Sequence, residues 1–277
     1  MSTGAARPPL TRAVVIGVTG RMGQALMRTA PSFPQLLITG AIASPGSLAL
    51  GRDAGQVAGI GTANLAITSD LPAALAQADV AVDFSDAAAT RDTLAACRAA
   101  RKPLLLGTTA YGTALDPELN AAAREVAVLV APNTSVGATA LTELTRQASR
   151  ALPASFDIDV IELHHRLKQD APSGTALALA RAAAEARGIA APTGGGPGFP
   201  PGPRPEGAIG LASLRAGDIV GEHTVLFSGA GEELTLTHRA RDRSVFARGA
   251  LAAALWLSSQ PPGRYGMSDF IFAKTEA

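Results

Sequence analysis

The chain has 277 residues, of which 47% are hydrophobic, a formal net charge of +1 and a single cysteine, Cys97. This length suits two domains, and the balanced charge excludes the broad basic field of a nucleic-acid-binding protein. No apolar run approaches the roughly 20 residues of a membrane span, and the first ten residues hold no signal-peptide core. Because one cysteine cannot form an internal disulfide and no Cys/His cluster has metal-ligand spacing, we expect a cytoplasmic protein without a metal centre.

The first motif follows a short apolar strand predicted at residues 13–16. Residues 17–23 read Gly-Val-Thr-Gly-Arg-Met-Gly and lead into a helical stretch. Strand, glycine-rich turn and helix in this order are typical of a dinucleotide site, because the glycines let the backbone approach a pyrophosphate and the helix start donates to it. Thr19 replaces the usual second glycine, and Arg21 could reach a phosphate. Alone, the motif is weak, because such turns are common.

A second strand, predicted at 36–43, ends about 20 residues after the glycine turn, where an acidic residue usually binds the adenosine ribose. Ser44 and Pro45 stand there instead. Ser44 is neutral and can donate to phosphate oxygens, so we expect both NADH and NADPH to work, with NADPH favoured by no more than about tenfold. The following stretch, 46–67, is glycine-rich and irregular in composition.

Strands and helices alternate over the rest of the first half. Strands are predicted at 79–85, 103–106 and 126–130, with helices at 87–101 and 117–124. This alternation indicates a parallel sheet with right-handed crossovers, whose polar strand ends meet at the edge where open α/β sheets bind ligands. We therefore expect a Rossmann-like α/β dinucleotide-binding domain over 1–132, completed by 243–277.

The second half has a different pattern. A helix is predicted at 137–152, and strands at 209–214, 219–227 and 233–238 follow one another without helices between them. Closely spaced strands indicate a mixed or antiparallel sheet, so we expect an α+β substrate-binding domain over 133–242. For His223 and His238, which lie in or beside these strands, a structural role is favoured.

A stretch rich in proline and glycine, 192–207, interrupts this half. It is either a mobile loop over a site or a featureless linker. Its only basic residue is Arg204.

Ionisable and hydrogen-bonding side chains are most concentrated in residues 162–175, which read Glu-Leu-His-His-Arg-Leu-Lys-Gln-Asp-Ala-Pro-Ser-Gly-Thr. Two histidines, an arginine and a lysine fall within five positions, between a strand predicted at 156–161 and a helix predicted at 175–187. Ser173 or Thr175 can cap that helix, and its first N–H groups can bind an anion. The cations and donors could converge on a carboxylate-bearing substrate. The alternative is a basic surface loop beside an ordinary capped helix.

Together these motifs resemble those of the dihydrodipicolinate reductases, over nearly the full length. The matching segments are Gly17-x-x-Gly20-Arg21-Met22-Gly23, Val82-Asp83-Phe84-Ser85, Gly107-Thr108-Thr109, Asn133-x-Ser135-Val136-Gly137, the run 162–176 and Arg215-Ala216-Gly217-Asp218-Ile219-Val220-Gly221-Glu222-His223. The run beginning at Glu162 is the most specific of these, and the glycine turn is the least specific.

The resemblance implies an enzyme of lysine and diaminopimelate biosynthesis that reduces 4-hydroxy-tetrahydrodipicolinate to tetrahydrodipicolinate, with NADPH or NADH and with loss of water. It implies a small dicarboxylate substrate and a homotetramer assembled through the sheet of the second domain, with no nucleic-acid or membrane partner. Two other functions stay open: another two-domain NAD(P) dehydrogenase, of the aspartate or homoserine type, and a non-catalytic NAD(P)-binding sensor.

Site residues follow by motif match. His164 falls at the family's proton-donor position, with Lys168 at a second donor position. His165, Gly174 and Thr175 fall at substrate-binding positions, and Ser173 precedes them. The cofactor contacts implied, with Ser44 added from its place after the second strand, are Gly17, Val18, Thr19, Gly20, Arg21, Met22, Ser44, Gly107, Thr108, Thr109, Ala131, Pro132, Asn133 and Thr134.

The chemistry of these residue types agrees with the implied reaction. Adding hydride to an unsaturated ring leaves electron density that needs a proton, and a histidine is a suitable acid near neutral pH. Nearby Arg166 and Lys168 should lower the pKa of His164, whereas bound carboxylates should raise it. Thr134 stands where several family members carry phenylalanine, which leaves the packing of the nicotinamide open.

Overall fold

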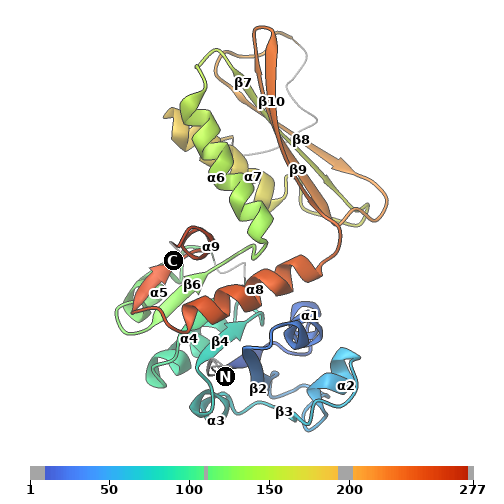
Figure 1. The fold of residues 1–277 in the computed structure, drawn as a ribbon, viewed down its shortest axis with the longest axis vertical. Helices are drawn as coiled ribbons and strands as arrows, with labels where there is room; N and C mark the ends of the chain where they lie inside the picture. Colours follow the sequence, from blue (N-terminus) through green and yellow to red (C-terminus); the bar gives the residue numbers. More distant parts are fainter. Residues whose placement is uncertain (1–9, 109–111, 193–201, 274–277) are drawn as a thin grey trace, which may run out of the picture. The chain divides into compact units, whose positions relative to one another are not determined.

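The computed structural model describes residues 10–108, 112–192 and 202–273. The chain divides into two compact units, one made of residues 1–135 and 244–277 and the other of residues 136–243 (Figure 1). The helix near the C-terminus therefore belongs to the same unit as the glycine turn. None of the described helices is both long enough and apolar enough to cross a membrane.

The first unit is built on a seven-stranded sheet whose recorded strand pairs are all parallel. Its strand order is β11-β6-β5-β4-β1-β2-β3, as expected of a Rossmann-like sheet with crossover connections. The strands are β1 (Thr11–Ile16), β2 (Leu36–Ile42), β3 (Ile67–Thr68), β4 (Val80–Asp83), β5 (Leu104–Leu106), β6 (Ala127–Val130) and β11 (Gly263–Tyr265).

Helices bury both faces of this sheet. Successive residues of β1 point to opposite faces, so Val14 belongs to one hydrophobic core and Val15 to the other. This is why the strand reads as a continuous apolar run. The helices are α1 (Arg21–Thr29), the short 3₁₀ helix η1 (Ala30–Ser32), α2 (Ala54–Ala58), α3 (Leu71–Ala76), α4 (Thr90–Ala99), α5 (Asp116–Ala122), α8 (Ser244–Leu257) and α9 (Met267–Ile271).

Helix α8 explains how the end of the chain completes the first unit. Its small buried residues, among them Ala247, Gly249 and Ala250, allow close packing against α1 and against β4, β5 and β6. The three-residue strand β11 then extends the sheet beside β6.

The second unit is a four-stranded mixed sheet, order β10-β9-β7-β8, with helices on one face. Strand β7 pairs in parallel with β8 and antiparallel with β9, and β9 pairs antiparallel with β10. The elements are α6 (Val136–Ala151), β7 (Asp157–His164), α7 (Gly174–Arg187), β8 (Ile209–Arg215), β9 (Gly221–Gly229) and β10 (Glu232–Ala240). The predicted fold class, a Rossmann-like sheet plus a smaller mixed sheet, is confirmed.

Strand β7 places two ionisable side chains on the face of the sheet that α6 and α7 cover. Its residues alternate between the two faces, and Ile158 and Val160 pack in the core under α6 and α7. Glu162 and His164 continue the same buried row, at 0% and 8% exposure. Two ionisable residues therefore occupy buried positions that in a strand of this kind are usually apolar.

Candidate active site

The glycine turn between β1 and α1 is packed so closely that its first and last glycines cannot carry a side chain. Gly17 has φ +78°, and a Cβ added to it would lie 2.5 Å from the carbonyl oxygen of Phe84. A Cβ on Gly23 would lie 2.2 Å from the carbonyl oxygen of Gly17. Gly17 thus lets the turn pack against the end of β4, and Gly23 lets α1 approach the turn.

The start of α1 presents N–H groups to a ligand. Its N-cap residue, Gly20, offers no side-chain cap, and the amide of Gln24 donates to the carbonyl of Gly20 at 3.0 Å. The N–H groups of the first turn have no acceptor within the helix, which makes this nine-residue helix suited to a pyrophosphate. The turn therefore fits the dinucleotide that the sequence predicts.

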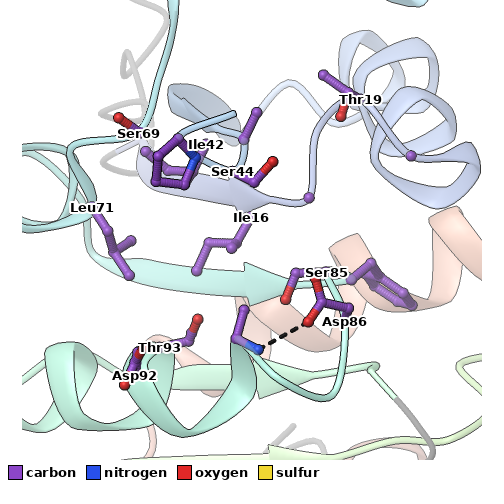
Figure 2. A pocket seen from close by; sticks show the side chains of 16 residues that line it. Ile16, Thr19, Ile42, Ser44, Ser69, Leu71, Ser85, Asp86, Asp92 and Thr93 are labelled. Carbon is purple, nitrogen blue, oxygen red and sulfur yellow. Dashed lines mark hydrogen bonds between the residues drawn. The ribbon is translucent and has the colours of Figure 1, made fainter. Parts of the chain in front are cut away.

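A pocket of about 440 Å³ adjoins this turn (Figure 2). Ile16 and Ile42 contribute apolar walls, and Ser44 and Ser69 lie across the pocket from Asp92. Its lining comprises Ile16, Gly17, Thr19, Gly20, Ile42, Ala43, Ser44, Pro45, Ser69, Leu71, Phe84, Ser85, Asp86, Ala89, Asp92 and Thr93. It contains no lysine or arginine from the described part of the chain.

Four of the predicted cofactor residues, Gly17, Thr19, Gly20 and Ser44, line this pocket. The structure does not bring the other predicted residues into its lining. Among these, Thr109 lies outside the described residues. The remaining ones are Val18, Arg21, Met22, Gly107, Thr108, Ala131, Pro132, Asn133 and Thr134.

Several of the remaining cofactor candidates have structural contacts. A Cβ on Gly107 would lie 2.3 Å from the ring of Phe84, so Phe84 packs directly on that glycine. The hydroxyl of Thr108 donates to the buried carboxyl of Asp83 at 3.3 Å, and burial raises the pKa of Asp83. The hydroxyl of Thr134 donates to the carbonyl of Phe246 in α8 at 2.7 Å. These side chains organise the strand ends, and their backbones remain candidates for cofactor contact.

In the second unit, the proposed proton donor lies at the end of β7. Nδ1 of His164 is hydrogen-bonded to Oε2 of Glu162, which belongs to the same buried row of the strand. Burial lowers the pKa of His164, and the negative charge of Glu162 opposes that shift. Lys168 and Arg215 add to the lowering.

Glu162 is held by two further groups. Nη2 of Arg215 donates to its Oε1 at 2.8 Å, and the backbone N–H of Ser173 donates to the same oxygen at 3.3 Å. Burial by itself would raise the pKa of Glu162, but hydrogen bonds led by that from Arg215 lower it overall. Glu162 is therefore a carboxylate at neutral pH.

His223 joins this cluster from β9. Its Nε2 lies 3.0 Å from Oγ of Ser173, and its ring meets the ring of His164 edge-on, with centroids 5.1 Å apart. Burial lowers the pKa of His223 to about 4, so this histidine is neutral at physiological pH. Sequence reasoning assigned neither His223 nor Arg215 to the site. The available signal is strand register, because His223 pairs with Glu162 and Arg215 pairs with His164.

The same cluster is the group of described residues that could hold a metal ion. Ligand atoms of Glu162, His164 and His223 lie within 4.8 Å of one another. The guanidinium of Arg215, however, already binds the carboxylate of Glu162. Its positive charge would repel a divalent cation at the same carboxylate. The three side chains are better explained as one hydrogen-bonded unit.

The predicted carboxylate-binding residues lie on the segment between β7 and α7 and at the first two positions of α7. Nζ of Lys168 contacts both carboxylate oxygens of Asp170 at 2.8 Å, and this contact lowers the pKa of Asp170. Gly174 is exposed with open space around it, whereas His165 and Thr175 are half-buried. Ser173 is buried, and its hydroxyl accepts from the N–H of Ala176 at 3.2 Å. Ser173 thus caps α7 and also contacts Glu162 and His223 of the buried cluster.

Comparisons with known proteins agree over both units. A family model described as "Dihydrodipicolinate reductase, N-terminus" matches residues 11–134, and one described as "Dihydrodipicolinate reductase, C-terminus" matches residues 137–271. The 4-hydroxy-tetrahydrodipicolinate reductase of Anaeromyxobacter dehalogenans is 45% identical over 95% of this chain and 98% of its own length. That of Alkalilimnicola ehrlichii is 46% identical over 94% and 98%.

Solved structures show the same fold. A dipicolinate-bound dihydrodipicolinate reductase from Paenisporosarcina sp. TG-14 superposes with a TM-score of 0.75 at 22% identity, covering 95% of this chain and 100% of that chain. The family models span both units, and the curated relatives match almost from end to end. The chain belongs to the dihydrodipicolinate reductase family.

Proposed function

We propose that this protein reduces 4-hydroxy-tetrahydrodipicolinate to tetrahydrodipicolinate with NADPH or NADH, with loss of water, in lysine and diaminopimelate biosynthesis. The observation that carries the proposal is the buried pair of Glu162 and His164 at the end of β7, in a chain whose relatives carry that reductase name. A dehydrogenase of the aspartate or homoserine type would share the nucleotide-binding half but would not need the His164-His165 run or the Ser173-Gly174-Thr175 helix start.

The chain's own residues would divide the chemistry as follows. When bound, the reduced nicotinamide supplies a hydride to the unsaturated ring of the substrate. His164 donates the proton that completes the reduction and is reprotonated from solvent. The glycine turn, the start of α1 and Ser44 would hold the cofactor, and backbone groups at 107–109 and 131–134 would join them by motif match.

For the substrate, the proposed contacts are cations and N–H donors. Lys168 would exchange its contact with Asp170 for a substrate carboxylate, and Gly174 and Thr175 would donate from the start of α7, assisted by His165. The likeness to a dipicolinate-bound reductase supports a small dicarboxylate as the ligand class.

We also propose a homotetramer assembled through the mixed sheet, in the cytoplasm. Alternation along the strands directs Ile161, Leu163, Leu214 and Leu226 to the face opposite α6 and α7. Leu214 is 49% exposed. An apolar sheet face of this kind supports association with further copies of the chain.

A coupled assay tests the proposed function. Substrate is generated in situ by condensing pyruvate with aspartate semialdehyde, and loss of the absorbance of the reduced nicotinamide is followed. The wild type should oxidise both coenzymes, and His164→Gln should lower turnover by about 10²- to 10⁴-fold, the range for removing a general acid. Coenzyme affinity should not change. Wild-type turnover in that variant would exclude His164 as the donor, and an inactive wild type would exclude the function.

A further inference from the structure

We propose that Glu162 is a positioning residue for the reduction: it holds Nδ1 of His164, so that the proton on Nε2 is the one delivered, and Arg215 holds Glu162 in place. This inference rests on the proposed function and assigns the carboxylate and the guanidinium roles that act through the histidine.

The first step of the argument is the environment of Glu162. Its side chain has no exposed surface, so the carboxylate must be stabilised by partners within the protein. Oε1 is occupied by Arg215 and by the backbone N–H of Ser173, and Oε2 faces Nδ1 of His164. Because residues two apart on a strand share a face, this contact fixes the histidine ring against the strand that carries it.

The second step concerns the two ring nitrogens of His164. Nδ1 is committed to Glu162, whereas Nε2 lies beside Gly221, where an added Cβ would come within 3.0 Å. Glycine at that position keeps the space beside Nε2 open. A carboxylate at Nδ1 stabilises the tautomer that keeps its proton there after Nε2 has released its own. The geometry therefore makes Nε2 the reacting nitrogen.

The third step concerns Arg215, which connects the proton donor to the loop that follows it. From β8 its Nη2 donates to Glu162 at 2.8 Å and to the backbone carbonyl of Asp170 at 2.6 Å. Asp170 in turn contacts Lys168, the proposed ligand of a substrate carboxylate. One guanidinium thus supports both the acid and the segment that carries the carboxylate-binding lysine.

The negative charge of Glu162 also affects the pKa of His164. Burial lowers the pKa of His164, and the charge of Glu162 opposes that shift, so neutralising Glu162 should lower the pKa further. A general acid works only when protonated, and turnover is lost as the pH rises through its pKa. Removing the charge should therefore move this loss of turnover to lower pH.

The decisive comparison is between Glu162→Gln, which keeps the shape and removes the charge, and Glu162→Asp, which keeps the charge and withdraws it by one methylene. We expect Glu162→Gln to lower kcat by about tenfold to a hundredfold, to leave both KM values within about twofold, and to shift the falling limb of the kcat–pH profile to lower pH. Glu162→Asp should lower kcat while shifting that limb less. Glu143→Gln, which removes a carboxylate paired with Arg146 on α6, is the matched control and should behave as wild type.

A second readout does not depend on turnover. The chain has four histidines, so nitrogen NMR of the labelled imidazoles can follow the titration and tautomer of His164 in the absence of substrate. The neutral ring should carry its proton on Nδ1 in the wild type, and its pKa should fall in Glu162→Gln. An unchanged titration and pH profile in Glu162→Gln would overturn the inference, and so would the opposite tautomer.

These readouts separate the inference from the proposed function. If the wild type does not reduce the substrate, the proposed function fails, whereas the NMR result still reports whether Glu162 controls the histidine. If Glu162→Gln does not fold, Glu162→Asp decides: unchanged kcat together with an unchanged His164 tautomer would contradict a positioning role. A loss of kcat matched by an equal loss of coenzyme affinity would indicate general structural damage and would also contradict it.

Discussion

His223 is the buried histidine that should make folding most sensitive to acid. Its pKa in the folded protein is about 4, against an ordinary value near 6.5, so the unfolded chain binds more protons between these two pH values. The free energy of unfolding should therefore fall as the pH drops from about 6.5 to about 4, by on the order of 3 kcal/mol. Urea unfolding of the wild type and of His223→Gln across this range measures the difference.

The variant should lose part of this acid sensitivity, even if it is less stable at neutral pH because Ser173 loses a partner. Parallel stability curves for wild type and His223→Gln would show that other groups cause the acid sensitivity.

Ser44 is the residue at which coenzyme choice can be tested. The pocket that contains it offers hydroxyls and the carboxylates of Asp86 and Asp92, but no lysine or arginine from the described residues. A 2′-phosphate would find no cation there, so we expect NADH to be used at least as well as NADPH. This expectation differs from the sequence-based one, which favoured NADPH by up to about tenfold and left Arg21 available for the phosphate.

Ser44→Arg should raise the ratio of NADPH to NADH kcat/KM by about tenfold or more, since arginine forms strong paired bonds with phosphate. Leu48→Arg adds the same charge at a fully exposed position on the same segment and should change the ratio little. A strong NADPH preference in the wild type would mean that a cation outside the described pocket binds the phosphate.

At the scale of elements, Arg204 attaches the segment before β8 to β7. Its guanidinium contacts the carboxylates of Asp157 and Asp159 at 3.0 and 2.9 Å, and donates to the carbonyls of Ile158 and Ala208 at 2.8 and 2.7 Å. The sequence singled it out only as the basic residue of a stretch rich in proline and glycine. Residues 193–201 of that stretch lie outside the described residues, so its predicted role as a loop over the site stays a prediction.

Arg204→Ala should lower the free energy of unfolding by about 2–3 kcal/mol, because hydrogen bonds between charged groups are lost from a largely buried side chain. Arg204→Lys should restore little, since one ammonium cannot replace a planar guanidinium that bonds several acceptors. Thermal and urea unfolding measure both variants, with Arg91→Ala, at an exposed pair with Glu118, as the control. Wild-type stability in Arg204→Ala would refute the attachment.

Local signals predicted the long elements well. The helix expected from Thr175 to Arg187 is α7, which starts at Gly174 after the Ser173 cap and ends before Gly188 in a left-handed conformation. The sequence missed α2 because its order depends on distant contacts. Asp53 caps that helix and also accepts the N–H groups of Ala63 and Leu65, ten and twelve residues further on.

Only part of the candidate site could be predicted from the sequence. His164 and Lys168 could be found because they are neighbours in the sequence, and the residues that control His164 could not, because strand pairing brings them together. Arg215 reaches Glu162 across 53 positions, and His223 reaches Ser173 across 50. Only the register of β8 and β9 against β7 shows that a guanidinium and a second histidine face the same buried carboxylate.

For the whole molecule, the open face of the mixed sheet predicts self-association. Light scattering during gel filtration should give a mass about four times 28.0 kDa for the wild type. Leu214→Glu should weaken the assembly by placing charge on that apolar face, whereas Leu48→Glu, at a fully exposed residue of the first unit, should not. A monomeric wild type at micromolar concentration would contradict the proposed tetramer.

The proposed reaction is tested most directly by tracing the hydride. Reduced coenzyme carrying two deuterium atoms at C4 of its nicotinamide ring is incubated with the protein and with substrate generated in situ, and the product is analysed by mass spectrometry. The wild type should form tetrahydrodipicolinate carrying one deuterium for each coenzyme oxidised, and His164→Gln should form it far more slowly. Coenzyme that stays reduced while substrate is present, or a product without deuterium, would contradict the proposed reduction.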